Sequence, residues 1–187
     1  EGQNGFDLGQ QLLRSMAQGL GLPAEFFEHN LTAAPTPLFR IFRYPPHPAG
    51  DVATWGVGEH TDYGLITLLA QDHHGGLQVR SQGEWIDVPA DPDLFVVNIG
   101  DMLERMTRGI YRSTPHRVIN TSPRDRLSFP FFFDPGFDAR MLPVEGLVND
   151  ALADDSGGRW DQASVHEFSG TYGDYLLAKV SKVFPEL

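Results

Sequence analysis

The sequence contains no cysteine. Disulfide bonds, thiolate metal sites, iron–sulfur clusters and cysteine nucleophiles are therefore excluded, and any metal ion must be held by nitrogen and oxygen atoms. Basic residues are also scarce, because 14 Lys and Arg stand against 25 Asp and Glu and give a net charge of -11. A chain this acidic, without a Lys/Arg cluster, is expected to bind neither nucleic acid nor an anionic membrane surface.

Long apolar runs are missing as well, since none approaches the ~20 residues that a membrane-spanning helix needs. Residues 1–9 have neither the basic start nor the apolar stretch of a secretion signal, so a cytoplasmic protein is expected. The 187 residues suit one domain, expected to span 1–187. Because the chain has no initiating Met and runs almost at once into a helix, we expect that it lacks an upstream N-terminal region.

Short strand patterns separated by Gly, Pro, Asp and Ser turns fill the middle of the sequence. The predicted strands are Leu38–Tyr44, Trp55–Asp62, Leu65–Gln71, Gly76–Arg80, Glu84–Val88, Leu94–Ile99, His116–Asn120 and Leu127–Phe133. Such spacing is typical of a sandwich or barrel. The sequence therefore predicts a mainly β fold, a double-stranded β-helix or jelly roll with flanking α-helices, whose core covers about 36–135.

Helical patterns flank and interrupt these strands. The first helix is predicted from an N-cap at Asp7, with an apolar face of Leu8, Leu12, Met16 and Leu20. In the middle of the chain, Asp101 and Glu104 suggest a capping box at the start of another helix, and Gly109 is expected to end that helix. Asn98, just before it, is expected to have a role in a turn. The last helix is expected over 171–184, packed on the outside of the sheet by Tyr172, Leu176, Val180 and Val183. The patternless stretch Pro143–Gly158 is expected to be a surface excursion.

The segment Gly58-Glu59-His60-Thr61-Asp62-Tyr63-Gly64 is the most informative motif. Side chains alternate along an extended chain, so His60 and Asp62 project the same way and can bind one ion, although such a pair alone is more often a surface turn. His116, at the start of a later strand, offers a third ligand that a jelly roll can bring alongside. Two histidines and one carboxylate leave three positions open on a six-coordinate metal, which suits iron(II) that binds a bidentate co-substrate and dioxygen.

Arg126 and Ser128 form a second pair on one strand face, which is predicted to point inward. A planar guanidinium matches a carboxylate, and a buried arginine needs an anion. The alternative interpretation is a structural salt bridge between Arg126 and one of the many carboxylates of the chain.

The sequence resembles the isopenicillin N synthase-like family of iron(II)/2-oxoglutarate-dependent oxygenases. The resemblance rests on three motifs in this order: His60-x-Asp62, His116-Arg117-Val118 and Arg126-x-Ser128. The resemblance covers most of the chain, and it includes the Tyr44-Pro45 strand end. It implies that iron(II) binds His60, Asp62 and His116, and that the distal carboxylate of 2-oxoglutarate binds Arg126 and Ser128. Tyr44 matches the tyrosine that in relatives hydrogen-bonds the co-substrate or the substrate.

The activity that this resemblance implies is that of a dioxygenase, which uses O2 to hydroxylate, desaturate or cyclise a small molecule and releases succinate and CO2. The first alternative is an iron-dependent oxidase or cyclase of the isopenicillin N synthase type that does not use 2-oxoglutarate, because the motifs are shared. A non-catalytic jelly-roll binding module would be marked by loss of a metal ligand, and a zinc hydrolase of the cupin type would have no evident use for Arg126 and Ser128.

Three phenylalanines follow Arg126-x-Ser128 in the same strand. Phe129, Phe131 and Phe133 share one face, which could line an apolar pocket or belong to the plain jelly-roll core.

Overall fold

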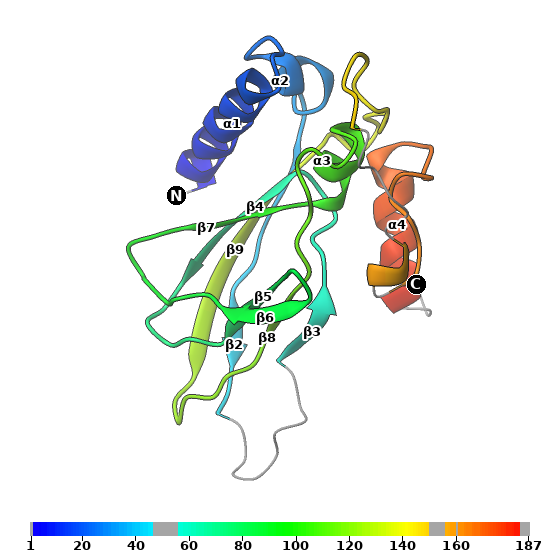
Figure 1. Cartoon of the computed structure of the whole chain (residues 1–187). Coiled ribbons are helices and arrows are strands. Elements are labelled where there is room, and N and C mark those ends of the chain that lie inside the picture. Colours follow the sequence, from blue (N-terminus) through cyan, green and yellow to red (C-terminus); the bar gives the residue numbers. More distant parts are fainter. Residues whose placement is uncertain (1, 47–55, 150–155, 160, 184–187) are drawn as a thin grey trace.

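The structure, a computed structural model, describes residues 2–46, 56–149, 156–159 and 161–183. Two antiparallel sheets form its centre (Figure 1): one has the strand order β1–β9–β4–β7 with β2 also beside β9, and the other the order β3–β8–β5–β6. The strands are β1 (Thr36–Phe39), β2 (Phe42–Tyr44), β3 (Val57–His60), β4 (Ile66–Gln71), β5 (Leu77–Ser81), β6 (Glu84–Asp87), β7 (Val96–Ile99), β8 (His116–Val118) and β9 (Arg126–Asp134). The predicted mainly β architecture is confirmed, whereas the single-domain boundary stays a prediction.

The predicted strand Leu38–Tyr44 is divided into β1 and β2, but both halves follow β9 in a single register. Phe39 lies opposite Phe131 in the first half, and Phe42 lies opposite Ser128 in the second. Directly opposed residues of an antiparallel pair share a face, so even-numbered residues here point the same way as even-numbered residues of β9. Trp55, the predicted start of the next strand, lies outside the described residues.

The N-terminal helix α1 (Gly2–Gly19) packs on β4 and β9 of the five-stranded sheet. It begins before Asp7, so the predicted N-cap there is wrong and Asp7 is an exposed residue inside the helix. The predicted apolar face does pack on the main core, through Leu8, Leu12, Met16 and Leu20. A short helix, α2 (Phe26–Asn30), follows and buries Phe27 in the same core.

The odd-numbered phenylalanines of β9 lie on the side of the sheet away from His60 and His116. Phe131 and Phe133 pack under α1, where the Phe6 and Phe133 ring centroids are 5.3 Å apart. The idea that this face lines a pocket is wrong, because Arg126 and Ser128 are even-numbered and strand alternation puts them on the opposite face from the odd-numbered phenylalanines.

Helix α3 (Asp101–Met106) has Gly100 at its N-cap, in an extended conformation and without a side-chain cap. The predicted capping box of Asp101 and Glu104 is therefore wrong, and both carboxylates are buried instead. The predicted end at Gly109 is consistent with its left-handed backbone, which has a φ of 71°. The last helix, α4 (Tyr172–Val183), lies on the other side of the strands from α1 in Figure 1.

The predicted surface excursion is partly wrong, because Val144 is 5% exposed and belongs to the main core. Residues 150–155 of that stretch and Phe184, the predicted helix end, lie outside the described residues. Every helix within the described part of the chain is too short or too polar to cross a membrane.

Candidate active site

The two predicted histidines lie on neighbouring strands of the four-stranded sheet. His60 ends β3 and pairs in register with His116, which begins β8, and their ring centroids are 4.2 Å apart. Asp62 follows two residues after His60, and its Oδ1 is 3.7 Å from Nε2 of His116. One ligand atom from each of the three residues lies within 4.8 Å of the others. The structure thus brings the predicted metal-binding residues together.

Hydrogen bonds to the backbone orient both rings. Nδ1 of His60 lies 2.8 Å from the carbonyl oxygen of Gly58, and Nδ1 of His116 lies 3.0 Å from that of Thr114. Because a carbonyl only accepts, each Nδ1 carries a hydrogen, which makes Nε2 the nitrogen that a metal would bind.

The electrostatic environment also fits a cation. Asp62 is buried, and its Oδ2 has no hydrogen-bond partner in the part of the chain that the structure describes. Burial, followed by the neighbouring His116, lowers the pKa of His60, which favours the neutral ring that binds metals. Two neutral imidazoles and one under-bonded carboxylate fit a divalent ion such as iron(II).

The arginine pair lies on the other sheet. Arg126 has 0% exposure on the inner face of β9, and its Nη2 donates to Oε1 of Gln71 at 2.9 Å. Its Nε and Nη1 are buried, and no described residue forms a hydrogen bond with them. Burial lowers the pKa of Arg126, but a guanidinium in a protein stays charged. Among the described residues no carboxylate forms an ion pair with it, so the salt-bridge interpretation is wrong.

Ser128 and Tyr44 lie beside this guanidinium through strand register. Ser128 is opposite Gln71 on β4, and Tyr44 is opposite Arg126 on β2. The Arg126 guanidinium lies 5.2 Å from the centroid of the Tyr44 ring. Both residues are buried, and both line the same cavity as Arg126.

One cavity of about 630 Å³ joins the His60–Asp62–His116 group to the Arg126 end. Most of its other walls are apolar, formed by Leu38, Phe42, Val57, Leu69, Leu77, Val118, Pro130, Phe132, Leu176, Val180 and Val183. The last three belong to α4, so the prediction that the apolar side of this helix packs outside the sheet is wrong. The cavity leaves an apolar compartment beside the metal-binding group.

Sequence reasoning gave no site role to several polar residues of this cavity, among them Asn98 and Asp134. Asn98 lies on β7 opposite Thr67, is buried, and lines the cavity instead of forming a turn. Asp134 accepts a hydrogen bond of 2.5 Å from the hydroxyl of Tyr172, and burial raises the pKa of Asp134 to about 7 although that bond works against the rise. Its even-numbered place on β9 is the signal that could have identified it.

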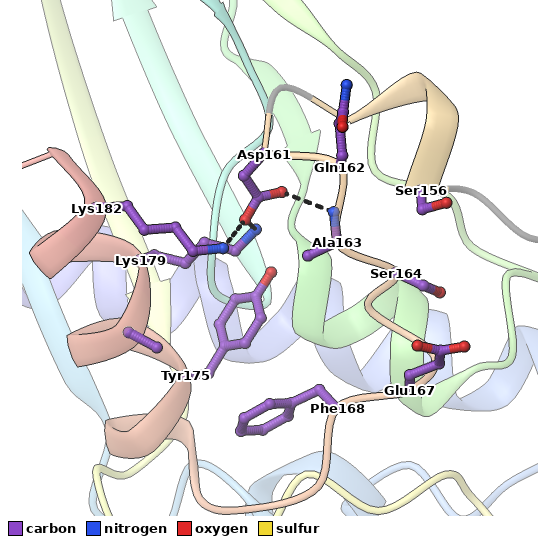
Figure 2. A pocket seen from close by; sticks show the side chains of 11 residues that line it. Ser156, Asp161, Gln162, Ala163, Ser164, Glu167, Phe168, Tyr175, Lys179 and Lys182 are labelled. Atoms are coloured by element: carbon purple, nitrogen blue, oxygen red, sulfur yellow. Dashed lines mark hydrogen bonds and ion pairs between the residues drawn. The ribbon is translucent and has the colours of Figure 1, made fainter.

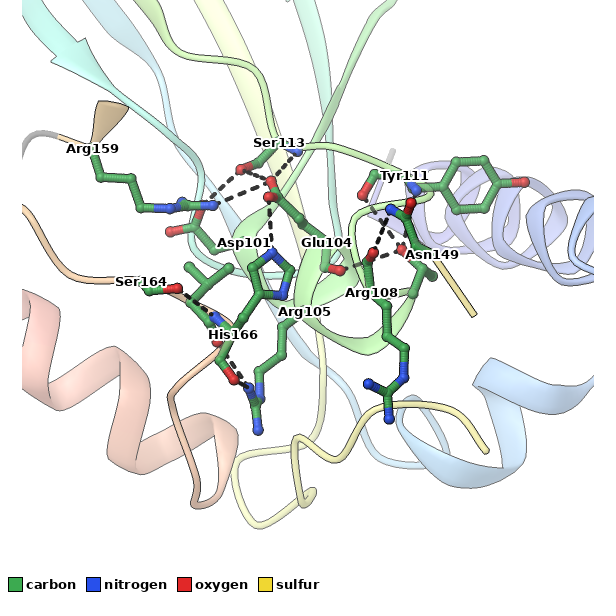
Figure 3. Close-up of polar contacts among 12 residues, drawn as sticks. Asp101, Glu104, Arg105, Arg108, Tyr111, Ser113, Asn149, Arg159, Ser164 and His166 are labelled. Atoms are coloured by element: carbon green, nitrogen blue, oxygen red, sulfur yellow. Dashed lines mark hydrogen bonds and ion pairs between the residues drawn. The ribbon is translucent and has the colours of Figure 1, made fainter. Parts of the chain in front are cut away.

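A buried polar network surrounds Asp101 and Glu104 of α3 (Figure 3). The backbone N–H of Asp101 donates to the carbonyl of Asp62 at 2.7 Å. The Asp101 carboxylate accepts hydrogen bonds from Ser113 at 3.0 Å, Tyr175 at 2.7 Å and Arg159 at 2.7 Å. Ser113 also bonds to Glu104, through its backbone N–H and its hydroxyl, at 2.7 Å each. The network thereby connects the Asp62 loop with the segment that leads to His116.

A second cavity, of about 530 Å³, lies between α4 and the segment before it (Figure 2). Its carboxylate Asp161 accepts hydrogen bonds from Lys179 at 2.7 Å and Lys182 at 2.8 Å. Burial alone would raise the pKa of Asp161, but these hydrogen bonds lower it to about 2. None of the site residues predicted from the sequence lies there.

Comparisons with known proteins agree with this geometry. Residues 35–135 match the family described as the 2OG-Fe(II) oxygenase superfamily. The chain is 49% identical over 195 residues to a probable iron/ascorbate oxidoreductase of Dictyostelium discoideum, covering 96% of this chain and 54% of the relative. It is also 47% identical over 163 residues to a 2-oxoglutarate-dependent dioxygenase of Monascus ruber, covering 84% of this chain and 45% of that protein.

The solved structures include a full-length Neurospora crassa protein in complex with alpha-KG, with a TM-score of 0.80 and 28% identity over 97% of this chain and 56% of that one. This likeness confirms the predicted jelly roll. The chain spans about half the length of the curated relatives it matches. The family match covers residues 35–135, and the relative of 49% identity covers 96% of this chain. The chain therefore belongs to the 2OG-Fe(II) oxygenase superfamily.

Proposed function

We propose that this chain forms the catalytic core of an iron(II)- and 2-oxoglutarate-dependent dioxygenase that oxidises a small molecule. One observation carries the proposal: a single cavity connects the His60–Asp62–His116 group with the buried Arg126, whose Nε and Nη1 have no hydrogen-bond partner among the described residues. A cation and a dicarboxylate bound together would satisfy both ends of this cavity.

Each polar residue then has a role. His60, Asp62 and His116 would hold iron(II), Arg126 and Ser128 would bind the distal carboxylate of 2-oxoglutarate, and Tyr44 would hydrogen-bond the co-substrate or the substrate. When bound, iron with 2-oxoglutarate and O2 supplies oxidation of the substrate, and the co-substrate is decarboxylated to succinate and CO2.

The remaining cavity residues act by binding and by excluding water. Leu69, Leu77 and Phe132 give the inner walls an apolar surface, and Leu176 and Val180 of α4 add a further wall. A dry cavity strengthens the contacts of the charged groups and protects reactive species from water. The net charge of -11 supports a small-molecule substrate over a nucleic acid.

The alternative of an iron-dependent oxidase without 2-oxoglutarate uses the same motifs. Relatives named as 2-oxoglutarate-dependent dioxygenases support the co-substrate reading. A non-catalytic binding module would not need the three ligand residues to converge, as they do here.

An anaerobic titration of the iron(II)-loaded protein with 2-oxoglutarate tests the proposal. The visible metal-to-ligand charge-transfer band of a chelated 2-oxo acid should grow and saturate. If iron binds and no band forms, the oxidase is the better description. Absence of iron binding would contradict both the dioxygenase and the oxidase.

A further inference from the structure

A second arginine faces the cavity, near its open side. Arg40 lies between β1 and β2, and its backbone N–H donates to the carbonyl of Pro130 at 3.0 Å. Because β1 and β2 follow β9 in one register, Arg40 lies opposite Pro130 and shares the inner face with Leu38 and Phe42. All four residues line the cavity, which places a guanidinium on a mainly apolar inner surface.

The Arg40 guanidinium has no carboxylate partner among the described residues. Its guanidinium carbon lies 4.8 Å from the centroid of the Phe42 ring. Arg43, on the outer face of the same segment, does have such a partner, because its Nε donates to Asp125 at 2.7 Å. A charged group on the inner face is thus left for something other than the protein.

The carboxylates that line the cavity are already engaged. Glu59 forms an ion pair with Arg80 at 3.0 Å, and Asp134 accepts the hydroxyl of Tyr172. Asp62 belongs to the metal-binding group. Arg40 is exposed, so in the free protein its guanidinium is hydrated and open to an anionic ligand that enters the cavity.

We propose that Arg40 binds a carboxylate of the substrate, and that the substrate is a small organic acid with an apolar body. The arginine fork binds carboxylates in a bidentate manner, and the walls formed by Leu38, Phe42 and the α4 residues suit a hydrocarbon portion. The inference rests on the proposed function and names the substrate class of that same cavity. Arg126, at the buried end, is occupied by 2-oxoglutarate, so the two arginines bind different anions.

The test uses matched probes on the protein loaded anaerobically with iron(II) and saturating 2-oxoglutarate, which keeps Arg126 occupied. Octanoate is compared with octanamide, and 4-phenylbutyrate with 4-phenylbutyramide, by calorimetric titration and by the change each causes in the charge-transfer band. At least one acid should bind about tenfold or more tightly than its amide, as expected for one charge-assisted contact near solvent. That preference should vanish in Arg40→Met and be partly kept in Arg40→Lys.

Arg43→Met is the control, since Arg43 lies on the same segment but faces outward, and it should keep the preference for acids. The proposal is overturned if amides bind as well as acids, if neither acid binds, or if Arg43→Met loses the preference as Arg40→Met does. The charge-transfer band recorded before any probe is added distinguishes a failure of the proposed function from a failure of the proposed role of Arg40. Absence of the band contradicts the proposed function, whereas a normal band without acid preference contradicts only the role of Arg40.

Discussion

At the scale of single residues, the site is marked by buried polar atoms that the protein leaves unbonded. Three buried atoms have no hydrogen-bond partner within the described part of the chain: Oδ2 of Asp62, and Nε and Nη1 of Arg126. Each such atom costs free energy in the ligand-free protein, because it has lost water and gained nothing in return. The unpaired atoms carry opposite charges at two ends of one cavity, which is the arrangement that a metal with an anionic co-substrate requires.

Arg126→Ala should raise the 2-oxoglutarate concentration needed for half-saturation by roughly two orders of magnitude, because a charge-assisted contact of about 3 kcal/mol is lost. Iron(II) affinity in the absence of 2-oxoglutarate should change little. The anaerobic charge-transfer titration measures both effects. Arg43→Ala, on the outer face, is the control, and an unchanged requirement in Arg126→Ala would assign that arginine another role.

Asp134 should make the metal-free protein less stable as the pH rises from about 4 to above 7. Its folded pKa of about 7 lies above the ordinary value of 3.8, so the folded state binds the proton more tightly and loses this advantage as the proton leaves. The full effect is about 4 kcal/mol, from ~1.36 kcal/mol per pKa unit.

Denaturant unfolding of the protein and of Asp134→Asn, from pH 4.5 to 8.5, measures the difference. The variant should gain in relative stability as the pH rises, whereas a constant difference would contradict the raised pKa. In Tyr172→Phe, the loss of stability with rising pH should occur at a higher pH, because the Tyr172 hydrogen bond lowers the Asp134 pKa.

At the scale of elements, α3 connects the metal-binding loops to the C-terminal part of the chain. Its buried Asp101 and Glu104 both contact the Arg159 guanidinium, at 2.7 Å and 3.2 Å (Figure 3). Two carboxylates in a buried position need such a cation nearby. A short segment outside the sheets thus contributes to the position of the Asp62 loop.

Arg159→Met should lower the free energy of unfolding by roughly 3 kcal/mol, because two buried carboxylates lose their cation. It should also weaken iron(II) binding, since Asp101 donates its backbone N–H to the carbonyl of Asp62. Chemical denaturation and iron titration at a temperature well below unfolding measure the two effects separately. The exposed Arg112→Met is the control, and equal stability of the two variants would show that Arg159 does not hold the network.

The contact between α1 and β9 depends on a glycine. A Cβ at Gly9 would lie 2.8 Å from the Phe133 ring, whereas one at Gly5 would lie at an ordinary 3.4 Å from Phe131. Gly9→Ala should therefore destabilise the protein by about 1–3 kcal/mol through overpacking. Gly5→Ala should be neutral or stabilising by up to ~1 kcal/mol, because alanine favours a helix. Thermal and denaturant unfolding compare them, and similar effects at both positions would contradict the packing argument.

At the scale of the whole molecule, the site is shared between the two sheets. His60 and His116 belong to the four-stranded sheet, and Arg126, Ser128 and Tyr44 to the five-stranded sheet. Iron and 2-oxoglutarate bound together would therefore connect both sheets through one cavity. Ligand binding should be visible in global unfolding and not only in the local structure of the site.

Iron(II) with 2-oxoglutarate should raise the unfolding temperature more than either ligand alone. A ligand at a hundred times its Kd adds about 2.7 kcal/mol to the stability of the folded state. Anaerobic thermal unfolding with each ligand and with both measures this, and Arg126→Ala should lose most of the increment due to 2-oxoglutarate. Equal stabilisation by iron alone and by the pair would argue against a shared site.

The sequence by itself determined the mainly β class, most of the strands and the six residues that the structure brings into one cavity, although their roles stay predictions. These depend on local information: period-two alternation puts His60 with Asp62 and Arg126 with Ser128, and turn residues mark the strand ends. His116 was predicted as the third ligand because it begins a later strand that a jelly roll can bring alongside, whereas Tyr44 was assigned only through the family resemblance.

The tertiary structure alone decided which face of each element meets which neighbour. It turned Phe131 and Phe133 toward α1, turned the apolar side of α4 toward the cavity, and buried Asp101 in a network that a capping pattern had not predicted. An amphipathic pattern shows that a face is buried, but the partner of that face depends on contacts between residues far apart in the chain. For the same reason, only the register of β1 and β2 on β9 placed Arg40 on the inner face.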